Sequence, residues 1–277
     1  MLTQPPGLEL VNPNLRRGPF TAAMFDFDGT LSLIREGWSG IMANLGLELL
    51  REQNLVNGSE EPARHYLEEE MLKLSGKPSI FQMRRLADEL QARGGQPGDP
   101  EVYLKEFTRR LFEISDGRKA DLATGRVQPA AWAVPGSHEL LSNLRDRGIA
   151  LYLASGTDLD YVREEMDLLK LTEFFGKHIY APADNTPNFT KRDTVEMILR
   201  EHAIPGEQLL GFGDGYSETV EVKRAGGMAI AVASHEAGVP GVNLLKRRIL
   251  IELGADAVIP HYDGSERLVE WLFGSVE

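Results

Sequence analysis

The sequence predicts an α/β protein built on a parallel sheet, with a helical segment inserted after the first strand. Two observations predict this class. Short apolar runs that end in polar turns alternate with helix-like stretches, and this alternation is typical of a parallel sheet. Between about Ile34 and Trp132 the pattern is helical only and contains no run with the character of a buried strand. The sheet is therefore expected to be interrupted once, by a helical insert.

Three apolar runs define the first part of the expected sheet. They are Ala22–Phe25, Ile149–Ala154 and Leu209–Phe212, and each has the length of a buried strand and ends in a polar turn. Leucines at helical spacing precede the second run, and Arg147 and Gly148 are typical of the end of that helix. The alternation continues to the C-terminus, with a helix over Glu218–Ala225, strands over Met228–Val232 and Ala257–Ile259, and a last helix over Ser265–Phe273.

The insert itself divides into four expected helices. These are Met42–Glu52, Ala63–Leu74, Ile80–Ala92 and Val102–Ile114, with a break rich in glycine and proline at 94–100. We expect one domain from residues 1–33 and 133–277 and a second from residues 34–132. The proline-rich opening before Ala22 is expected to be an extended lead-in.

Composition limits the classes of partner. The chain has 277 residues, with 42 acidic and 30 basic side chains and a formal charge of -12. Nucleic acid is not an expected partner, because phosphate backbones require a basic surface. A membrane is not expected either, because no apolar run approaches the length of a spanning helix and the opening lacks the apolar core of a signal peptide. Cysteine is absent, and we expect a cytoplasmic protein that is a monomer or a homodimer.

Polar residues that follow strands should converge at one edge of a parallel sheet. The candidates are Asp26 and Asp28, Ser155, Lys191, and Asp214 with Glu218. Taken singly, each has a plain structural interpretation, such as a turn aspartate, a helix cap, a solvated surface pair or a first-turn acid. Together they provide a carboxylate nucleophile, a second acid, oxygen ligands for a metal, a hydroxyl and an ammonium. Phosphoryl transfer requires this combination.

These segments, from AspPheAspGlyThr at 26–30 to GlyAspGlyTyrSerGlu at 213–218, resemble the four motifs of the haloacid dehalogenase-like hydrolase superfamily. The resemblance covers residues 20–277. It implies a Rossmann-like core formed by residues 1–33 and 133–277, and it implies that the insert at 34–132 is a helical cap of the C1 type.

The resemblance also implies a role for each candidate residue. Asp26 would be the nucleophile that forms an aspartyl-phosphate, and Asp28 would be the general acid and base. Ser155, Gly156 and Lys191 would hold the phosphoryl oxygens. Mg²⁺ would be bound by the Asp26 carboxylate, the Asp28 backbone carbonyl and Asp214, and Glu218 matches the second acid of the last motif, where aspartate is common. The presence of Asp28 argues against a haloalkanoate dehalogenase, whose leaving halide needs no proton.

Substrate choice in such a protein is expected to come from the cap. Arg35, close to the first motif, is the tentative specificity residue, whereas Trp38 is more typical of a core position and Arg84 and Arg85 of a solvated helix face. The expected activity is a magnesium-dependent phosphatase for a small metabolite, with a sugar or polyol phosphate as the favoured class. The alternatives are a phosphomutase or phosphotransferase on a sugar phosphate and, less favoured, a non-catalytic protein that binds a phosphorylated ligand.

Overall fold

The computed structural model describes residues 4–183, 189–235 and 239–274, and in these residues it has a seven-stranded sheet with the order β1-β7-β6-β5-β2-β3-β4. The strands are β1 Glu9–Leu10, β2 Ala22–Phe25, β3 Ala150–Ala154, β4 Ile179–Tyr180, β5 Leu209–Gly213, β6 Met228–Val232 and β7 Ala257–Ile259. Neighbouring strands are parallel except β1, which pairs with β7 in antiparallel register. The predicted α/β class is confirmed.

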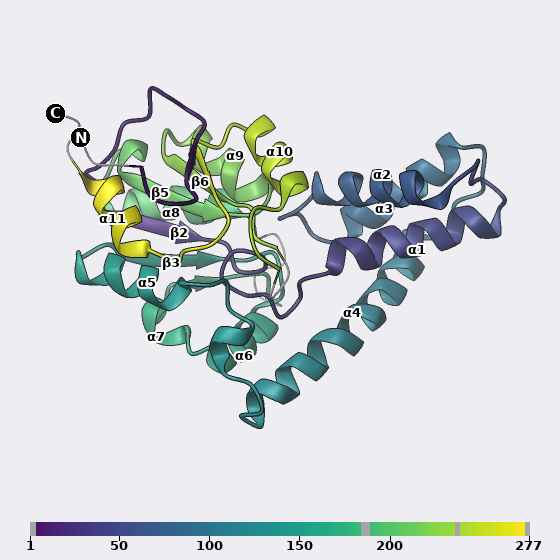
Figure 1. Ribbon diagram of the computed structural model, residues 1–277, viewed down its shortest axis with the longest axis horizontal. Coiled ribbons are helices and arrows are strands. Elements are labelled where there is room, and N and C mark those ends of the chain that lie inside the picture. Colours follow the sequence, from purple (N-terminus) through teal and green to yellow (C-terminus); the bar gives the residue numbers. More distant parts are fainter. Residues whose placement is uncertain (1–3, 184–188, 236–238, 275–277) are drawn as a thin grey trace.

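Helices cover both faces of this sheet (Figure 1). Helices α5 Ser137–Asp146, α6 Leu159–Leu168, α7 Thr172–Phe175 and α11 Ser265–Phe273 pack on one face, and α8 Lys191–His202, α9 Tyr216–Arg224 and α10 Leu244–Glu252 on the other. The alternation along β2 sets the two layers: Ala23 and Phe25 join the first core, while Ala22 and Met24 join the second. Short 3-10 turns lie at Pro129–Ala131 and Gly206–Gln208.

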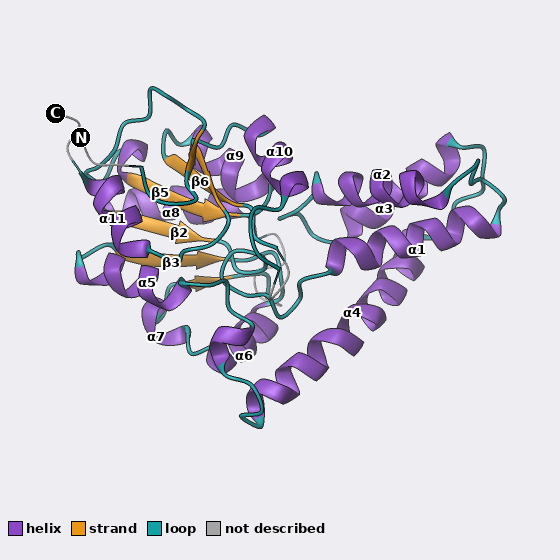
Figure 2. Ribbon diagram, in the orientation of Figure 1, coloured by secondary structure: helices purple, strands orange, loops and turns teal. Residues whose placement is uncertain are grey.

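A second group of helices stands beside the sheet, on the side to which the arrowheads of the parallel strands point (Figure 2). These helices are α1 Trp38–Glu52, α2 Glu60–Leu72, α3 Ile80–Ala92 and α4 Pro100–Ala123. They have a core of their own, in which Met42, Leu67 and Met83 are almost completely buried. Because the carboxyl ends of the strands face this helical unit, residues from both parts can line one site.

Most expected elements are present with bounds shifted by a few residues, and the structure differs more clearly at β1, β4 and α4. The lead-in contains β1, so the helical unit follows the second strand, β2, rather than the first. Neither β1 nor β4 was predicted, because two residues are too few to show a strand period. Helix α4 continues to Ala123, beyond the expected end at Ile114, and Lys119 in this extension forms an ion pair with Glu164 of α6 at 3.0 Å.

Candidate active site

The site begins at the loop that follows β2. Asp26 comes directly after the strand, and its amide donates to the carbonyl of Phe212 in the neighbouring strand β5 at 2.9 Å. The next residues turn tightly, with the amides of Leu31 and Ser32 donating to the carbonyl of Phe27 at 2.8 and 2.9 Å. A Cβ at Gly29, which has a φ of 73°, would lie 2.0 Å from Oδ2 of Asp214. Only glycine therefore allows this turn to approach Asp214 so closely.

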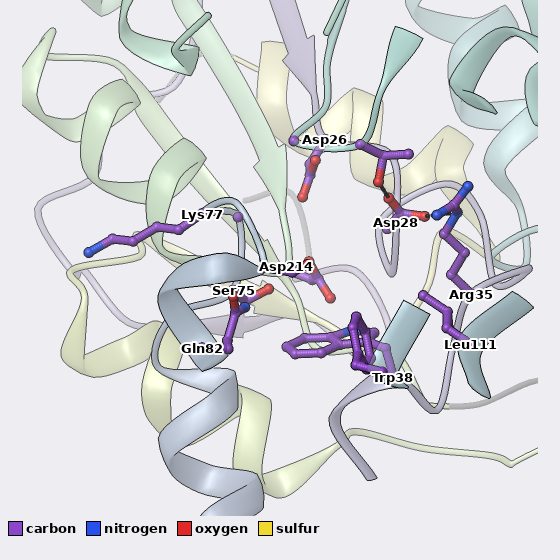
Figure 3. A pocket seen from close by; sticks show the side chains of 14 residues that line it. Asp26, Asp28, Arg35, Trp38, Ser75, Lys77, Gln82, Leu111 and Asp214 are labelled. Atoms are coloured by element: carbon purple, nitrogen blue, oxygen red, sulfur yellow. Dashed lines mark hydrogen bonds and ion pairs between the residues drawn. The ribbon is translucent and has the colours of Figure 1, made fainter. Parts of the chain in front are cut away.

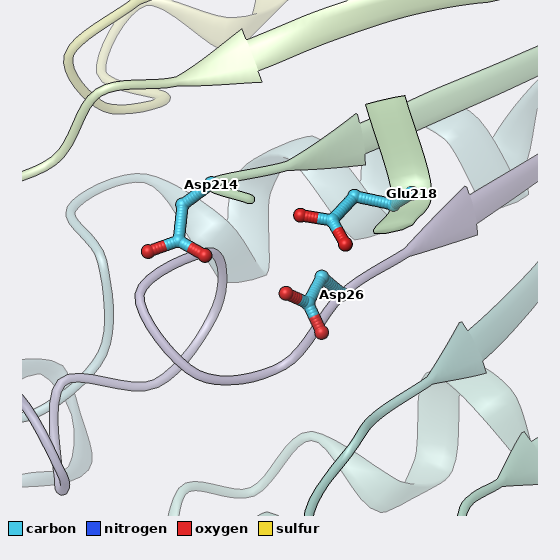
Figure 4. Close-up of side chains that lie close together, drawn as sticks. All are labelled: Asp26, Asp214 and Glu218. Carbon is cyan, nitrogen blue, oxygen red and sulfur yellow. The ribbon is translucent and has the colours of Figure 1, made fainter. Parts of the chain in front are cut away.

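Three buried carboxylates meet at this edge of the sheet (Figure 4). Asp214 follows β5, Glu218 lies in the first turn of α9, and Asp26 follows the adjacent strand β2. One carboxylate oxygen from each of the three lies within 4.8 Å of the others. Glu218 Oε1 also accepts a hydrogen bond from the Gly215 amide, which fixes its side chain. The sequence thus correctly indicated that Asp26, Asp214 and Glu218 converge.

Lys191 joins two of these carboxylates. Its ammonium lies 2.6 Å from Asp26 Oδ1 and 2.7 Å from Glu218 Oε2, and the residue is only 4% exposed. The expectation that Lys191 directly follows a strand is wrong. It is the first residue of α8, which is capped by the Thr190 side chain, and from this position its ammonium reaches Asp26 and Glu218.

A second buried lysine, which the sequence reasoning missed, lies on the other side of Asp214. Lys246 of α10 places its ammonium 3.0 Å from Asp214 Oδ2 and 3.2 Å from Glu36 Oε1. Its side chain is 2% exposed. Lys246 precedes Arg247 and Arg248, and such a basic run in a helix is typical of a solvated face. The sequence therefore held no signal that would have separated Lys246 from its neighbours.

Burial dominates the electrostatics of the cluster. It raises the pKa of Asp26 well above its usual range, and repulsion from Glu218 acts in the same direction. Burial also raises the pKa of Asp214 to about 6, although attraction to Lys246 opposes the shift. For Lys191, burial favours the neutral amine, but Asp26 and Glu218 outweigh it and the pKa rises above its usual value.

The charges around this cluster fit a divalent cation. With Asp26, Asp214, Glu218 and Glu36 ionised, four carboxylates share the two ammonium groups of Lys191 and Lys246, so two negative charges remain uncompensated. Buried charge without compensation is costly, and a hard divalent cation prefers carboxylate oxygens as ligands. The donor set formed by Asp26, Asp214 and Glu218 therefore suits Mg²⁺.

Asp28 belongs to a separate network at the mouth of the site. Its Oδ2 accepts a hydrogen bond from Thr157 Oγ1 at 2.8 Å, and its Oδ1 lies 3.8 Å from Nε of Arg35. Arg35 in turn donates twice to Oε1 of Glu165, at 2.9 and 2.7 Å. Burial raises the pKa of Glu165 to about 7, with attraction to Arg35 opposing the shift. Arg35 thus lies at the site, as predicted.

Sequence reasoning did not single out Thr157 or Glu165. Thr157 lies in the AlaSerGlyThr segment that had been recognised for Ser155, so its position was an available signal. Ser155 is completely buried, and its Oγ accepts a hydrogen bond from the Thr157 amide at 3.1 Å. Gly156 lines the pocket described below, whereas Ser155 does not.

A pocket of about 110 Å³ opens between the sheet edge and the helical unit (Figure 3). Its lining combines site residues with residues of the unit: Asp26, Asp28, Arg35, Trp38, Ser75, Gly76, Lys77, Ser79, Gln82, Phe107, Leu111, Gly156, Thr157 and Asp214. Typical sites for drug-sized molecules measure roughly 300–1,000 Å³, so this pocket suits a small substrate.

Trp38 and Gln82 give the pocket a mixed character. Trp38, for which a core position was expected, is partly buried and packs against the core of the helical unit, and it also lines the pocket. Gln82 is 3% exposed, and its Oε1 has no hydrogen-bond partner among the described residues. Lys77, which also lines the pocket, lies over the ring of Tyr216, 4.4 Å from the centroid. Arg85 pairs with Glu70 at 2.8 Å, on the surface of the unit.

Comparison with known proteins adds a family and a set of similar folds. A model of the haloacid dehalogenase-like hydrolases matches residues 20–226. No curated protein matches the sequence significantly. A hydrolase of this family from Deinococcus radiodurans, whose structure contains phosphate and sodium, is 19% identical, with a TM-score of 0.55 and coverage of 92% of this chain and 96% of the other.

Two further structures show the same fold at lower identity. A predicted phosphoglycolate phosphatase from Haemophilus somnus is 16% identical, with a TM-score of 0.54 over 90% of this chain and 98% of the other. A Bacteroides vulgatus protein, provisionally assigned as a beta-phosphoglucomutase, is 14% identical, with a TM-score of 0.53 over 92% and 91%.

Proposed function

Because the chain belongs to the haloacid dehalogenase-like hydrolases, we propose that it is a magnesium-dependent phosphatase that acts through an aspartyl-phosphate on Asp26. The substrate is a small phosphorylated metabolite, with a sugar or polyol phosphate as the favoured class. The observation that carries the proposal is the buried cluster of Asp26, Asp214 and Glu218, in which Lys191 bridges Asp26 and Glu218 and in which Asp26 and Asp214 line a pocket.

Asp26 is the proposed nucleophile. A carboxylate oxygen of Asp26 attacks the phosphorus, the bond from phosphorus to the ester oxygen breaks, and the phosphoryl group is left on Asp26. Mg²⁺, held by the Asp26 and Asp214 carboxylates, the Asp28 backbone carbonyl and Glu218, would supply positive charge that offsets the repulsion between nucleophile and phosphate. The ammonium of Lys191, 2.6 Å from Asp26 Oδ1, adds positive charge at the same place and opposes the effect of burial on the pKa of Asp26, which favours the ionised nucleophile.

Asp28 is the proposed general acid and base. Its carboxyl group donates a proton to the leaving ester oxygen, and the resulting carboxylate takes a proton from the water that hydrolyses the aspartyl-phosphate. The water oxygen bonds to phosphorus as the bond from phosphorus to Asp26 breaks, which releases phosphate and frees the Asp26 carboxylate. The hydrogen bond from Thr157 and the nearby Arg35 hold this side chain at the mouth of the pocket, where a leaving group would lie. At the end of the cycle Asp26 and Asp28 have regained their starting protonation states.

Ser155, the Gly156 amide and Lys191 are the proposed contacts for the phosphoryl oxygens. We further propose that residues 34–132 act as a cap of the C1 type that excludes water over the pocket, with Arg35 as a tentative specificity residue. Two contacts support this role. The Tyr216 amide donates to the Ser75 carbonyl at 3.0 Å, and Ser217 Oγ donates to the Gly76 carbonyl at 2.8 Å, so the helical unit touches the segment that carries Asp214 and Glu218.

The remaining parts of the proposal concern the partners, the location and the oligomeric state of the protein. No described helix is long and apolar enough to cross a membrane. The formal charge of -12 favours a small-molecule substrate over nucleic acid. A cytoplasmic location and a monomeric or homodimeric state complete the proposal.

The test is a panel of sugar, polyol, nucleotide and glycolytic phosphates, assayed for free phosphate with Mg²⁺ and with a chelator. We expect selective release that the chelator abolishes. The alternative activity is that of a phosphomutase, and the Bacteroides vulgatus protein with a similar fold is provisionally assigned as one. A phosphomutase would instead yield an isomerised sugar phosphate and no free phosphate. Release at the same rate in chelator would contradict the metal-dependent mechanism.

A further inference from the structure

The proposed mechanism leaves the buried ion pair of Lys246 and Glu36 without a use. We propose that Lys246, held in place by Glu36, is a positioning residue for the metal site: it fixes the carboxylate of Asp214 in the orientation that a divalent cation requires. The proposal rests on the metal site of the proposed function. It adds a connection between that site and the segment that leads into α1.

The contacts of Lys246 reach two parts of the molecule at once. Its ammonium lies 3.0 Å from Asp214 Oδ2 and 3.2 Å from Glu36 Oε1, and all three side chains are at most 7% exposed. Glu36 lies two residues before the start of α1, in the segment between Asp28 and the helical unit. Lys246 therefore ties a proposed metal ligand of the sheet domain to the entry of the helical unit.

The base of the lysine is itself fixed. Asn243 caps α10, and its Oδ1 accepts from the amides of Leu245 and Lys246, each at 3.1 Å. The turn after β2 also approaches Asp214: a Cβ at Gly29 would lie 2.0 Å from Asp214 Oδ2 and 3.2 Å from the Lys246 ammonium. The turn and the ammonium thus both lie close to Oδ2, and Asp214 has little room to rotate while Lys246 is present.

The charge of Lys246 and its contact with Asp214 affect cation binding in different ways. Through its charge, Lys246 repels a nearby cation but also stabilises the ionised form of Asp214, so loss of the charge alone acts on binding in both directions. If it acts by orienting Asp214, its removal weakens cation binding, as the loss of groups that orient metal ligands commonly does, by roughly 10- to 100-fold. A variant that loses Lys246 together with the opposite charge of Glu36 keeps the net charge of the site, so weaker binding by that variant indicates positioning.

The experiment is a Mn²⁺ titration of the full chain, with free Mn²⁺ measured by electron paramagnetic resonance and with no substrate present. The variants are Lys246→Met and the double variant Lys246→Met with Glu36→Gln. The double variant removes one charge of each sign, so the net charge of the site equals that of the wild type. It also avoids the additional uncompensated carboxylate that could prevent Lys246→Met from folding. We expect each variant to bind Mn²⁺ at least about 10-fold more weakly than the wild type.

Arg247→Met is the matched control. It removes the same type of charge from the adjacent position of α10, where Arg247 pairs with Glu9 on the outer strand β1. We expect its Mn²⁺ affinity to remain at the wild-type value. A general loss of stability would lower the melting temperature of a variant without changing the affinity of its folded fraction, so melting curves recorded beside the titrations separate stability from positioning.

The outcomes are distinct. Wild-type affinity in the double variant, or tighter binding by Lys246→Met, would overturn the positioning role and leave the proposed phosphatase intact. A wild-type protein that binds no Mn²⁺ would overturn the metal site, and with it both proposals. Weaker binding by both variants, with Arg247→Met unchanged, supports the role of Lys246.

Discussion

The ammonium of Lys191 lies 2.6 Å from Oδ1 of Asp26, and both side chains are buried at the end of the sheet. The carboxylate lies at the end of β2 and the ammonium comes from the first residue of α8, which follows β4 in the chain. In the proposed mechanism, this contact opposes the effect of burial on the pKa of Asp26 and so favours the charged carboxylate that attacks phosphorus.

Loss of the Lys191 ammonium should therefore impair both activity and stability. Lys191→Met should lower kcat/KM by about 10²–10³, the effect typical of removing one group that stabilises developing charge. It should also lower the melting temperature, because Asp26 and Glu218 lose their shared cation. Phosphate-release kinetics and thermal unfolding measure the two effects. Arg192→Met is the control, since Arg192 pairs with Glu196 on the exposed side of the same helix. Equal losses in the two variants would argue against a specific role for Lys191.

Asp28→Asn should distinguish substrates by their leaving groups. Without an acid at this position, hydrolysis of an alkyl phosphate should slow by about 10²–10⁴, because its leaving oxygen needs a proton. The leaving group of p-nitrophenyl phosphate departs without being protonated, so the transfer of its phosphoryl group to Asp26 should remain fast. Rapid-mixing measurements should then show a burst of p-nitrophenol followed by slow turnover, as the base for the second step is also lost. An equal slowing of the first turnover for both substrates would contradict the acid role.

The pKa of Glu165 predicts a change of stability with pH. Burial raises this pKa from 4.5 to about 7, so between these values the folded protein binds more protons than the unfolded chain. The contribution of Glu165 to the free energy of unfolding must then fall as the pH rises through this window, by up to roughly 3 kcal/mol. Urea unfolding of the wild type and of Glu165→Gln at pH 5 and pH 8 measures the difference. We expect the stability of the wild type relative to the variant to decrease between the two pH values, and a constant difference would refute the shift.

Removal of a metal ligand should be visible without any substrate. Mg²⁺ that binds only the folded protein raises its melting temperature in proportion to the logarithm of its concentration. In Asp214→Ala this rise should shift to much higher Mg²⁺ concentrations, and the concentration that supports half-maximal phosphate release should shift with it. Asp263→Ala, at an exposed aspartate outside the cluster, should behave as the wild type does. An unaltered Mg²⁺ titration of Asp214→Ala would exclude this aspartate as a ligand.

The sequence was informative where a candidate site residue follows a strand. Asp26 comes directly after one apolar run and Asp214 follows another after a single glycine, so their convergence could be predicted from the geometry of a parallel sheet alone. The two-residue strands β1 and β4 could not be predicted, because they are defined by pairing with distant strands and not by a local period.

The side chains that helices contribute to the site could not be predicted from the sequence, for a different reason. Lys246 and Glu165 stand among charged neighbours in amphipathic helices, and a sequence does not show which charged residue of such a helix points inward. Their burial depends on partners far along the chain: Glu36 and Asp214 for Lys246, and Arg35 for Glu165. Only the tertiary structure reveals these pairs.

The central claim is that Asp26 carries the phosphoryl group, and trapping of that group tests it most directly. The wild type and Asp26→Asn are mixed with Mg²⁺ and p-nitrophenyl phosphate, quenched in acid and digested, and the site of phosphorylation is mapped by mass spectrometry. We predict a phosphoryl group on Asp26 of the wild type and neither phosphorylation nor phosphate release in Asp26→Asn, which should keep its fold. A phosphoryl group on another residue, or turnover by Asp26→Asn at the wild-type rate, would contradict the account.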